Sequence, residues 1–309
     1  MKTALPVKLK GVLFSVLSAV LFGTSPIFFK TIAATGINTT TQVVVRSIVT
    51  MAIAGVLAGV KKQPILLKGR LLVDALLAFV AGQGLTAILL NSSYAYLPAG
   101  VSTSLHFVYP SVVMLACVLL FHEKINAAKL IALLLSVAAI ALMTDLRAAG
   151  QLAGVLLAVG SGCSYAFYIL YLERTPLMEI PVWTFAFWSS LGCLVAAAGL
   201  GVSTNTLDVS GATVKGVALL MLMVPLQSVI AVRFFQLGVR YSGATAASLL
   251  STMEPVTSTV LGVLILHETM DARKLIGCAA IVLSVILVVS GARRAEKAPE
   301  SRALPDQLG

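Results

Sequence analysis

The segment 243–287 repeats the segment 98–142, because a shift of 145 positions overlays the two without a gap. Aliphatic matches arise between any two apolar segments, so the overlay depends on less common residues. Those matches are Pro110 on Pro255, His122-Glu123 on His267-Glu268, and 129–131 on 274–276. A chain that repeats itself over this length is predicted to fold as two related units, which constrains its architecture more than any local feature.

A second, looser overlay extends the repeat to the rest of the chain. With a shift of 143 positions, Gly11 falls on Gly154 and Lys30 on Glu173. The tail after Gly291 is charged and rich in Pro, Ala and Glu, which is typical of a disordered extension. The predicted organisation is an N-terminal segment 1–10, a first repeat 11–150, a second repeat 151–292 and a tail 293–309.

Composition places both repeats in a membrane. Apolar residues make up 59% of the chain and charged residues 11%, against roughly 25% charged residues in soluble domains. The charges fall in clusters between apolar runs of about 20 residues, the length that crosses a lipid bilayer. A net charge of +10 would suggest nucleic acid in a soluble chain. Here the basic residues flank apolar runs, so we predict a lipid bilayer as partner and no nucleic acid.

Ten transmembrane helices are predicted, five in each repeat. Five is an odd number, so a second repeat with the fold of the first must enter the membrane from the opposite side. The fold class is therefore all-α, with two inverted five-helix repeats around a central cavity. We number the predicted spans 1 to 10, and their ranges are 11–32, 40–60, 71–90, 100–121, 127–144, 152–172, 182–202, 214–237, 244–266 and 275–290.

The loops give the orientation of these spans. If the N-terminus is cytoplasmic, the inside segments hold fifteen Lys and Arg residues and the outside segments five. Basic residues prefer cytoplasmic loops, so this bias predicts that both termini are cytoplasmic.

Four prolines lie inside predicted spans, where each removes a backbone donor and clashes with the preceding turn. In lipid, the freed carbonyls need partners from neighbouring helices or from a watery cavity, so helices broken in this way tend to surround an internal site. A plain shape-giving kink is the alternative at any one position. The predicted kinks are at Pro26, Pro110, Pro225 and Pro255.

Polar side chains near the middle of several spans predict a substrate cavity. Glu254 lies near the bilayer midplane, and its overlay partner Tyr109 precedes the matching proline. His106 is about one helical turn from Tyr109 on the same face. The full set of cavity candidates is Thr24, Ser25, Gln83, Asn91, Tyr94, His106, Tyr109, Ser164, Tyr165, Tyr168, Gln227 and Glu254.

Several of these residues have a purely structural alternative. His106 can serve as a hydrogen-bonding link between helices, and Tyr165 and Tyr168 can simply fill space. Arg46 is not among these candidates, because it lies near one end of span 2 and we expect its long side chain to reach the outer membrane surface.

Metal, cofactor and disulfide chemistry have little support. The two His-Glu pairs are expected on opposite membrane faces and cannot share an ion, so we predict no metal site and no cofactor. All four cysteines lie in apolar runs without the CxxC spacing, which argues against disulfides.

Glu254 has three open roles: a proton carrier, a binding group for a cationic part of the cargo, or a structural hydrogen-bonding group at the Pro255 kink. A carboxylate at this depth is costly unless it faces the interior, is partnered or is protonated.

The chain resembles the EamA branch of the drug/metabolite transporter superfamily over about residues 10–292. The resemblance depends on the order of Gly23, Arg46, Tyr109-Pro110, Glu123, Glu254-Pro255 and Glu268. It implies a bacterial inner-membrane permease that moves small metabolites by alternating access, through a cavity lined by spans 1, 3, 4, 6, 8 and 9. It also favours the structural role for Glu254, because Glu-Pro recurs at this position in relatives with unlike cargo.

These observations together predict a secondary transporter of a small organic solute, most simply an exporter of amino acids or related compounds. The main alternative is a proton- or gradient-coupled importer of an amino acid or amine. No nucleotide-binding loop of the form G-x-x-x-x-G-K-[ST] is present, so ATP is not the expected energy source. We do not expect an enzyme, because Cys163, His106 and Glu254 lack the spacing of a nucleophile with its base. A non-transporting scaffold would not need polar groups in several kinked helices.

Overall fold

A computed structural model describes residues 6–93, 96–97, 99–123, 125–143, 152–208, 210–267 and 270–297, with the side chains of 99–101 and 292–297 excepted. All regular secondary structure in these ranges is helical. Tyr94, Glu268, residues 144–151 and residues 298–309 lie outside the described residues.

Within the described residues, nine helical segments are long and apolar enough to cross a membrane. In the first repeat, span 1 is α1 (Val7–Gly23) with α2 (Ser25–Ala33), span 2 is α3 (Thr39–Val60), span 3 is α4 (Arg70–Ala75), η1 (Leu76–Gly84) and α5 (Leu85–Ser93), and span 4 is α6 (Ala99–His106) with α7 (Tyr109–Leu119). In the second repeat, span 6 is α9 (Leu152–Arg174), span 7 is α10 (Val182–Ser203), span 8 is α11 (Val214–Met223), η4 (Val224–Ala231) and α12 (Val232–Ser242), span 9 is α13 (Ala244–Leu250) with α14 (Met253–Leu266), and span 10 is α15 (Ala272–Lys297). A short 3₁₀ turn, η3 (Pro176–Met178), joins spans 6 and 7.

The predicted span 5 is α8 (Ala127–Met143), an apolar helix of 17 residues. At 1.5 Å per residue it is about 26 Å long, slightly shorter than a hydrocarbon core of about 30 Å. It packs extensively against α15, its counterpart in the second repeat. The tenth span and the placement of both termini in the cytoplasm stay predictions.

The backbone repeats at the shift found in the sequence. Asn126 caps the start of α8 by accepting a hydrogen bond from the Lys129 amide at 2.8 Å, and Asp271 caps α15 by accepting one from the Lys274 amide at the same distance. Both caps satisfy amide groups that the first turn of a helix leaves free. His122 and His267 both adopt the left-handed conformation, with φ of 52° and 55°. These pairs are the same positions of the two repeats.

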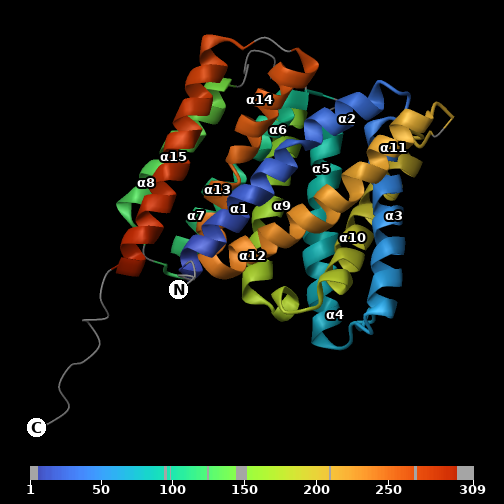
Figure 1. Cartoon of the computed structure of the whole chain (residues 1–309), viewed down its shortest axis with the longest axis horizontal. Coiled ribbons are helices and arrows are strands. Elements are labelled where there is room, and N and C mark those ends of the chain that lie inside the picture. Colours follow the sequence, from blue (N-terminus) through green and yellow to red (C-terminus); the bar gives the residue numbers. More distant parts are fainter. Residues whose placement is uncertain are drawn as a thin grey trace, which may run out of the picture.

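The contacts between helices are two-fold symmetric: a contact between two spans recurs between the equivalent spans of the other repeat. Span 1 packs on span 8, and the equivalent span 6 packs on span 3. Span 4 packs on span 6, and the equivalent span 9 packs on span 1. Spans 2 and 7 pack on each other, as do spans 5 and 10; in Figure 1, α3 and α10 lie at one edge and α8 and α15 at the other. The four spans 1, 3, 6 and 8 therefore fill the centre together with spans 4 and 9.

Five of these six central spans are interrupted, and only span 6 is one continuous helix. Span 1 breaks at Thr24, two residues before Pro26, and spans 4 and 9 break between α6 and α7 and between α13 and α14. Span 8 contains the π-helical stretch η4, which includes Pro225, and span 3 contains the π-helical stretch η1 without any proline. Such stretches leave backbone carbonyls with poor partners inside the helix, and those carbonyls become available to neighbouring side chains.

Candidate substrate site

Side chains from the break in span 1 and the π-helical stretch of span 8 form a hydrogen-bonded group. Ser25 donates to Gln227 Oε1 at 2.9 Å, and Gln227 Nε2 donates to Thr24 Oγ1 at 3.1 Å. Gln227 is fully buried. Ser18 reinforces the contact by donating to the Ala231 carbonyl at 2.8 Å, at the end of η4. Three of the predicted cavity residues, Thr24, Ser25 and Gln227, are thus brought together.

Glu254 lies beside the same break. Ser258, one turn along α14, donates to the Gly23 carbonyl at 2.8 Å. A Cβ added at Gly23 would come within 2.9 Å of the Glu254 carbonyl oxygen and 2.5 Å of Thr257. Only a glycine allows α1 and α14 to approach this closely, so Gly23 holds the first turn of α14 against the end of α1.

A second group is aromatic and joins spans 4 and 6. Tyr165 packs edge-on against Tyr109, with ring centroids 4.9 Å apart, and lies 5.4 Å from the His106 ring. It also stacks on Tyr168 at 5.7 Å and on Phe235 of span 8 at 6.3 Å. Ring pairs in this range of distances attract each other through their quadrupoles in addition to burying apolar area. Four of the predicted cavity residues meet in this group.

Span 6 also holds His106 through a hydrogen bond. Its Nδ1 lies 2.9 Å from the Ser161 hydroxyl, which donates to the Ala158 carbonyl at 2.6 Å. With its proton directed to that carbonyl, the Ser161 oxygen accepts from His106, so Nδ1 carries a proton. The contact between spans 4 and 6 is the interhelical link that was the structural alternative for His106.

Glu254 and the aromatic group face each other. The Glu254 carboxyl lies within electrostatic range of the Tyr109 and Tyr165 hydroxyls. The Tyr109 hydroxyl is buried near Ser251 but forms no hydrogen bond of good geometry in the described part of the chain. Glu254 is half-buried, and no described residue donates to its carboxylate. The structural role of Glu254 at the kink therefore has no side-chain hydrogen bond to support it here.

The remaining candidates lie on span 3 or beside it. Ser189 of α10 donates to Gln83 Oε1 at 2.9 Å, and Ser164 donates to the Gly82 carbonyl at 2.9 Å within η1. These contacts tie the π-helical stretch to spans 7 and 6. Asn91 makes no side-chain hydrogen bond with the described residues and does not join either group. Tyr94 lies outside the described residues.

Two pockets of the described structure lie away from these groups. One is an apolar groove of about 440 Å³ between span 3 and span 7, and its lining includes Val80, Leu85 and Val195. The other, of about 140 Å³, lies among the ends of α1, α8 and α15 near Lys8 and Lys129. Tyr109 and Gln227 are almost inaccessible. A solute must change the packing of the helices to reach them.

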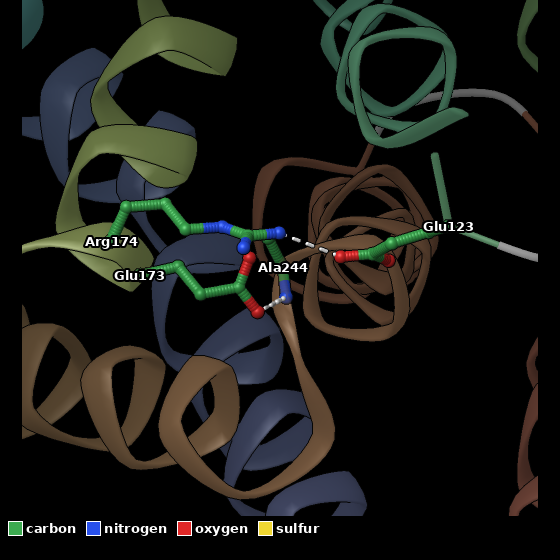
Figure 2. A network of polar contacts seen from close by, with 4 residues as sticks. All are labelled: Glu123, Glu173, Arg174 and Ala244. Atoms are coloured by element: carbon green, nitrogen blue, oxygen red, sulfur yellow. Dashed lines mark hydrogen bonds and ion pairs between the residues drawn. The ribbon is translucent and has the colours of Figure 1, made fainter. Parts of the chain in front are cut away.

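Three spans are tied together at one end of the bundle, as Figure 2 shows. Arg174, at the end of α9, forms an ion pair of 2.8 Å with Glu123, which follows α7, and its guanidinium lies 3.9 Å from the Phe121 ring centre. The neighbouring Glu173 accepts a hydrogen bond of 2.7 Å from the Ala244 amide, the first residue of α13. Spans 4, 6 and 9 are therefore linked on the face where spans 4 and 6 end and span 9 begins.

Sequence reasoning missed several residues that organise these groups. Ser18, Ser161 and Ser258 each make a contact between spans, yet serine is common in membrane helices and gives no signal by itself. Ser258 could have been found from its position one turn after Glu254, on the same face of the helix. Phe235 had no distinguishing signal.

Known proteins resemble this chain over half or more of its length in two cases and over part of it in a third. "Uncharacterized transporter YvbV" of Bacillus subtilis (strain 168) is 29% identical over 220 residues, which are 70% of this chain and 70% of that protein. "Uncharacterized transporter YwfM" of the same organism is 30% identical over 152 residues, which are 49% of this chain and 50% of that protein. A solved crystal structure shares the fold with a TM-score of 0.73 and 18% identity, covering 93% of this chain and 99% of the other.

The two repeats also match a family separately. The EamA-like transporter family matches residues 9–145 and residues 152–290, so both halves of the chain carry the family's pattern and little of the membrane region lies outside it. The two curated relatives are both described as transporters. This multi-pass, all-helical chain belongs to the EamA-like transporter family.

Proposed function

We propose that the chain is a secondary transporter of a small organic metabolite and that its physiological cargo is an amino acid or a related compound, which it exports. It would act in the inner membrane of a bacterium with both termini in the cytoplasm. The solute would pass between spans 1, 4, 6, 8 and 9, where the interrupted helices meet.

The observation that carries this proposal is the meeting of polar groups at the breaks of central helices. Thr24, Ser25 and Gln227 bind one another where spans 1 and 8 are irregular, and Glu254 lies beside them with no donor from the described residues. Burying such groups in a membrane is costly unless they find hydrogen-bond partners. Thr24, Ser25 and Gln227 find them in one another, which leaves the Glu254 carboxylate as the group that a solute or water would satisfy. Interrupted helices at a repeat interface are the usual setting of a transporter's binding site.

Alternating access is the mechanism that this packing favours. The aromatic and polar groups are closed in, and the links among Glu123, Arg174, Glu173 and Ala244 hold one face together. A rearrangement that breaks these links would open that face to the site. Because the contacts between spans are two-fold symmetric, an equivalent rearrangement could open the other face. The site would then be open to one side of the membrane at a time.

A transport assay in sealed vesicles tests the proposal. Purified protein is reconstituted into liposomes preloaded with unlabelled amino acids, and entry of the same labelled amino acid is followed against protein-free liposomes. We expect counterflow that saturates with solute concentration and is lost in Gln227→Leu. Absence of counterflow for all twenty amino acids, with folded protein in the vesicles, would contradict amino-acid cargo.

A proton-coupled importer is the second candidate, and the half-buried Glu254 is the observation in its favour. A carboxyl that alternates between two faces can load a proton on one side and release it on the other. An inward proton gradient imposed on the same vesicles should then accelerate uptake in the wild type but not in Glu254→Gln. Equal rates with and without the gradient would leave facilitated export as the better account.

A further inference from the structure

Arg46 is a cation within span 2 that belongs to neither of the two groups described above. It lies on the inner side of α3, between Gln42 one turn before it and Thr50 one turn after it, both fully buried. The lipid-facing side of the same helix carries Ile48 and Val56, which are 51% and 66% exposed. Residues four apart share one face of a helix, so Arg46 leaves α3 toward the protein interior and not toward lipid.

Arg46 lies near side chains of span 1 and span 7. Its guanidinium lies 5.9 Å from the ring centre of Phe29 in α2, and it lies within electrostatic range of Cys193 in α10. The α2 and α3 helices are fixed against each other because Gln42 donates to the Phe29 carbonyl at 3.2 Å. Arg46 is half-buried, and no described residue accepts a hydrogen bond from its guanidinium or forms an ion pair with it.

Arg46 of span 2 and Glu254 of span 9 both lie beside the same stretch of span 1. Glu254 lies against Gly23, and Arg46 lies over Phe29, six residues further along. Six helical residues rise by about 9 Å. Ser25, one turn before Phe29 in α2, belongs to the group with Thr24 and Gln227. The polar group therefore lies between the two charges along span 1.

A second route through the interior connects the same charges. Cys193 is within electrostatic range of Arg46 and of Tyr165, and Tyr165 is within range of Glu254. Arg46 and Glu254 are thus connected through side chains of spans 6 and 7 as well as along span 1. They are not joined in an ion pair, so each has hydrogen-bonding capacity left for a solute.

We propose that Arg46 and Glu254 form the two ends of a site for a zwitterion: Arg46 binds the carboxylate of an amino acid and Glu254 binds its ammonium group. The assignment rests on the proposed transport of amino acids and adds the recognition chemistry. A guanidinium presents two parallel donors to a carboxylate, whereas a carboxylate accepts from an ammonium.

The test uses solutes that lack one charge at a time. The full-length protein in detergent is heated with each of the twenty amino acids, because a ligand that binds the folded state raises its melting temperature. For each amino acid that stabilises the wild type, the methyl ester removes the carboxylate charge and the deaminated acid removes the ammonium. For phenylalanine, these probes are phenylalanine methyl ester and 3-phenylpropionate. The same solutes are then used as competitors of counterflow.

We expect the methyl ester and the deaminated acid to bind the wild type about 10- to 100-fold more weakly than the amino acid, since each lacks one charge-assisted hydrogen bond. Arg46→Gln should bind the amino acid and its methyl ester equally weakly, and Glu254→Gln should lose the preference for the ammonium. Arg46→Lys keeps the charge without the two parallel donors and should fall between wild type and Arg46→Gln. Lys68→Gln, which removes an exposed charge from the loop after α3, should behave as wild type.

Three results would overturn the proposal. One is equal binding of amino acid and methyl ester by the wild type, which needs no variant and so does not depend on how Arg46→Gln folds. Another is full discrimination by a folded Arg46→Gln or Arg46→Lys protein. The third is a wild type that neither binds nor moves any amino acid. If that protein moves another class of metabolite in vesicles, transport itself stands and only the zwitterion site fails.

Discussion

The Arg174 guanidinium forms an ion pair of 2.8 Å with the Glu123 carboxylate, and this contact joins the ends of spans 6 and 4. Both side chains are partly exposed, 44% and 40%, so solvent screening limits the pair to roughly 0–1 kcal/mol. A contact of this size adds little to folding stability. The same free energy is large enough to shift the equilibrium between a conformation that contains this ion pair and one that lacks it.

Breaking this pair should loosen the closed face without unfolding the protein. In a variant that keeps Cys117 as its sole cysteine, we expect Arg174→Gln to increase the rate of maleimide labelling by about 2- to 5-fold, the factor that corresponds to a pair of this strength. Cys117 is fully buried in α7, near Glu123. Labelling is followed in detergent by mass spectrometry.

Arg240→Gln is the matched control, because Arg240 is an exposed basic residue near the end of α12. It should leave the labelling rate unchanged. The double variant Glu123→Gln/Arg174→Gln should label no faster than either single variant, because one contact is lost in all three. Additive increases in the double variant would show that the two residues act separately and not as a gate.

Gly23 should be intolerant of the smallest side chain. A Cβ there would meet Thr257 at 2.5 Å and the Glu254 carbonyl at 2.9 Å, so Gly23→Ala must push α1 and α14 apart. Overpacking of this kind costs about 1–3 kcal/mol. We expect a lower melting temperature in detergent and weaker transport.

Gly55→Ala provides the comparison, because a Cβ at Gly55 in α3 would meet no atom within 4 Å. It should be neutral or slightly stabilising, since alanine favours a helix over glycine. A melting temperature equally lowered in both variants would mean that close approach at Gly23 is not what matters.

The repeat made much of the architecture predictable. Pairs such as Asn126 and Asp271 cap equivalent helices with the same hydrogen bond, and their positions were set by the shift of 145 residues. The His-Glu pairs looked like metal ligands in the sequence. In the structure, His122 and His267 instead adopt left-handed conformations at helix ends, a backbone property that residue identity alone does not specify.

The π-helical stretch in span 3 was not predictable. Its sequence, Leu76 to Gly84, is apolar except for Gln83 and has no proline, and over two turns such a pattern cannot distinguish a π-helix from an α-helix. The stretch is supported from outside by Ser164, which donates to the Gly82 carbonyl. Tertiary contacts of this kind decide local geometry, and no single sequence segment contains both partners.

Polar candidates were easier to find than their partners. Thr24, Ser25 and Gln227 were each predicted as cavity residues from their depth in the membrane, where polar groups need partners, but the hydrogen bonds among them were not predicted. Arg46 was not assigned to the site, because its position near one end of span 2 also allows its side chain to reach the surface. Its orientation became clear only when Phe29 and Cys193 were placed beside it.

Reporter fusions at both ends of α8 can test whether this helix crosses the membrane and brings the number of spans to ten. A periplasm-active reporter fused within residues 145–151 should be active, and a cytoplasm-active reporter fused after Arg294 should also be active, if α8 crosses the membrane as predicted. Activity of the cytoplasmic reporter at 145–151 would show that α8 does not cross, and the inverted repeat would then fail. A fusion in the segment between α7 and α8 provides the cytoplasmic reference.

The Tyr109 hydroxyl is expected to matter for transport but not for stability. It is buried without a hydrogen bond of good geometry in the described structure, so Tyr109→Phe should leave the melting temperature unchanged or raise it slightly. Its proximity to Glu254 predicts a reduction in transport of about 3- to 10-fold, the effect of losing one modest hydrogen bond to a bound solute.

Tyr171→Phe should show the reverse pattern. The Tyr171 hydroxyl donates to Asp74 at 2.8 Å, away from the aromatic group of spans 4 and 6, so its loss should cost about 1 kcal/mol of stability with little change in transport. If Tyr109→Phe instead lowers the melting temperature as Tyr171→Phe does, the Tyr109 hydroxyl is structural.

Glu254→Gln separates the three roles of this carboxyl. From the sequence and its family resemblance, a structural role was predicted, in which glutamine, with the shape and hydrogen-bonding groups of the protonated acid, would keep substantial transport. In the structure no described residue donates to the carboxylate, so we now expect a folded Glu254→Gln protein whose amino-acid counterflow falls about 10-fold or more, as expected when a charge-assisted hydrogen bond is lost. Counterflow measured without a pH gradient isolates binding from proton coupling. A drop seen only under an imposed gradient would assign Glu254 to proton transfer, and undiminished counterflow under both conditions would return it to a structural role at Pro255.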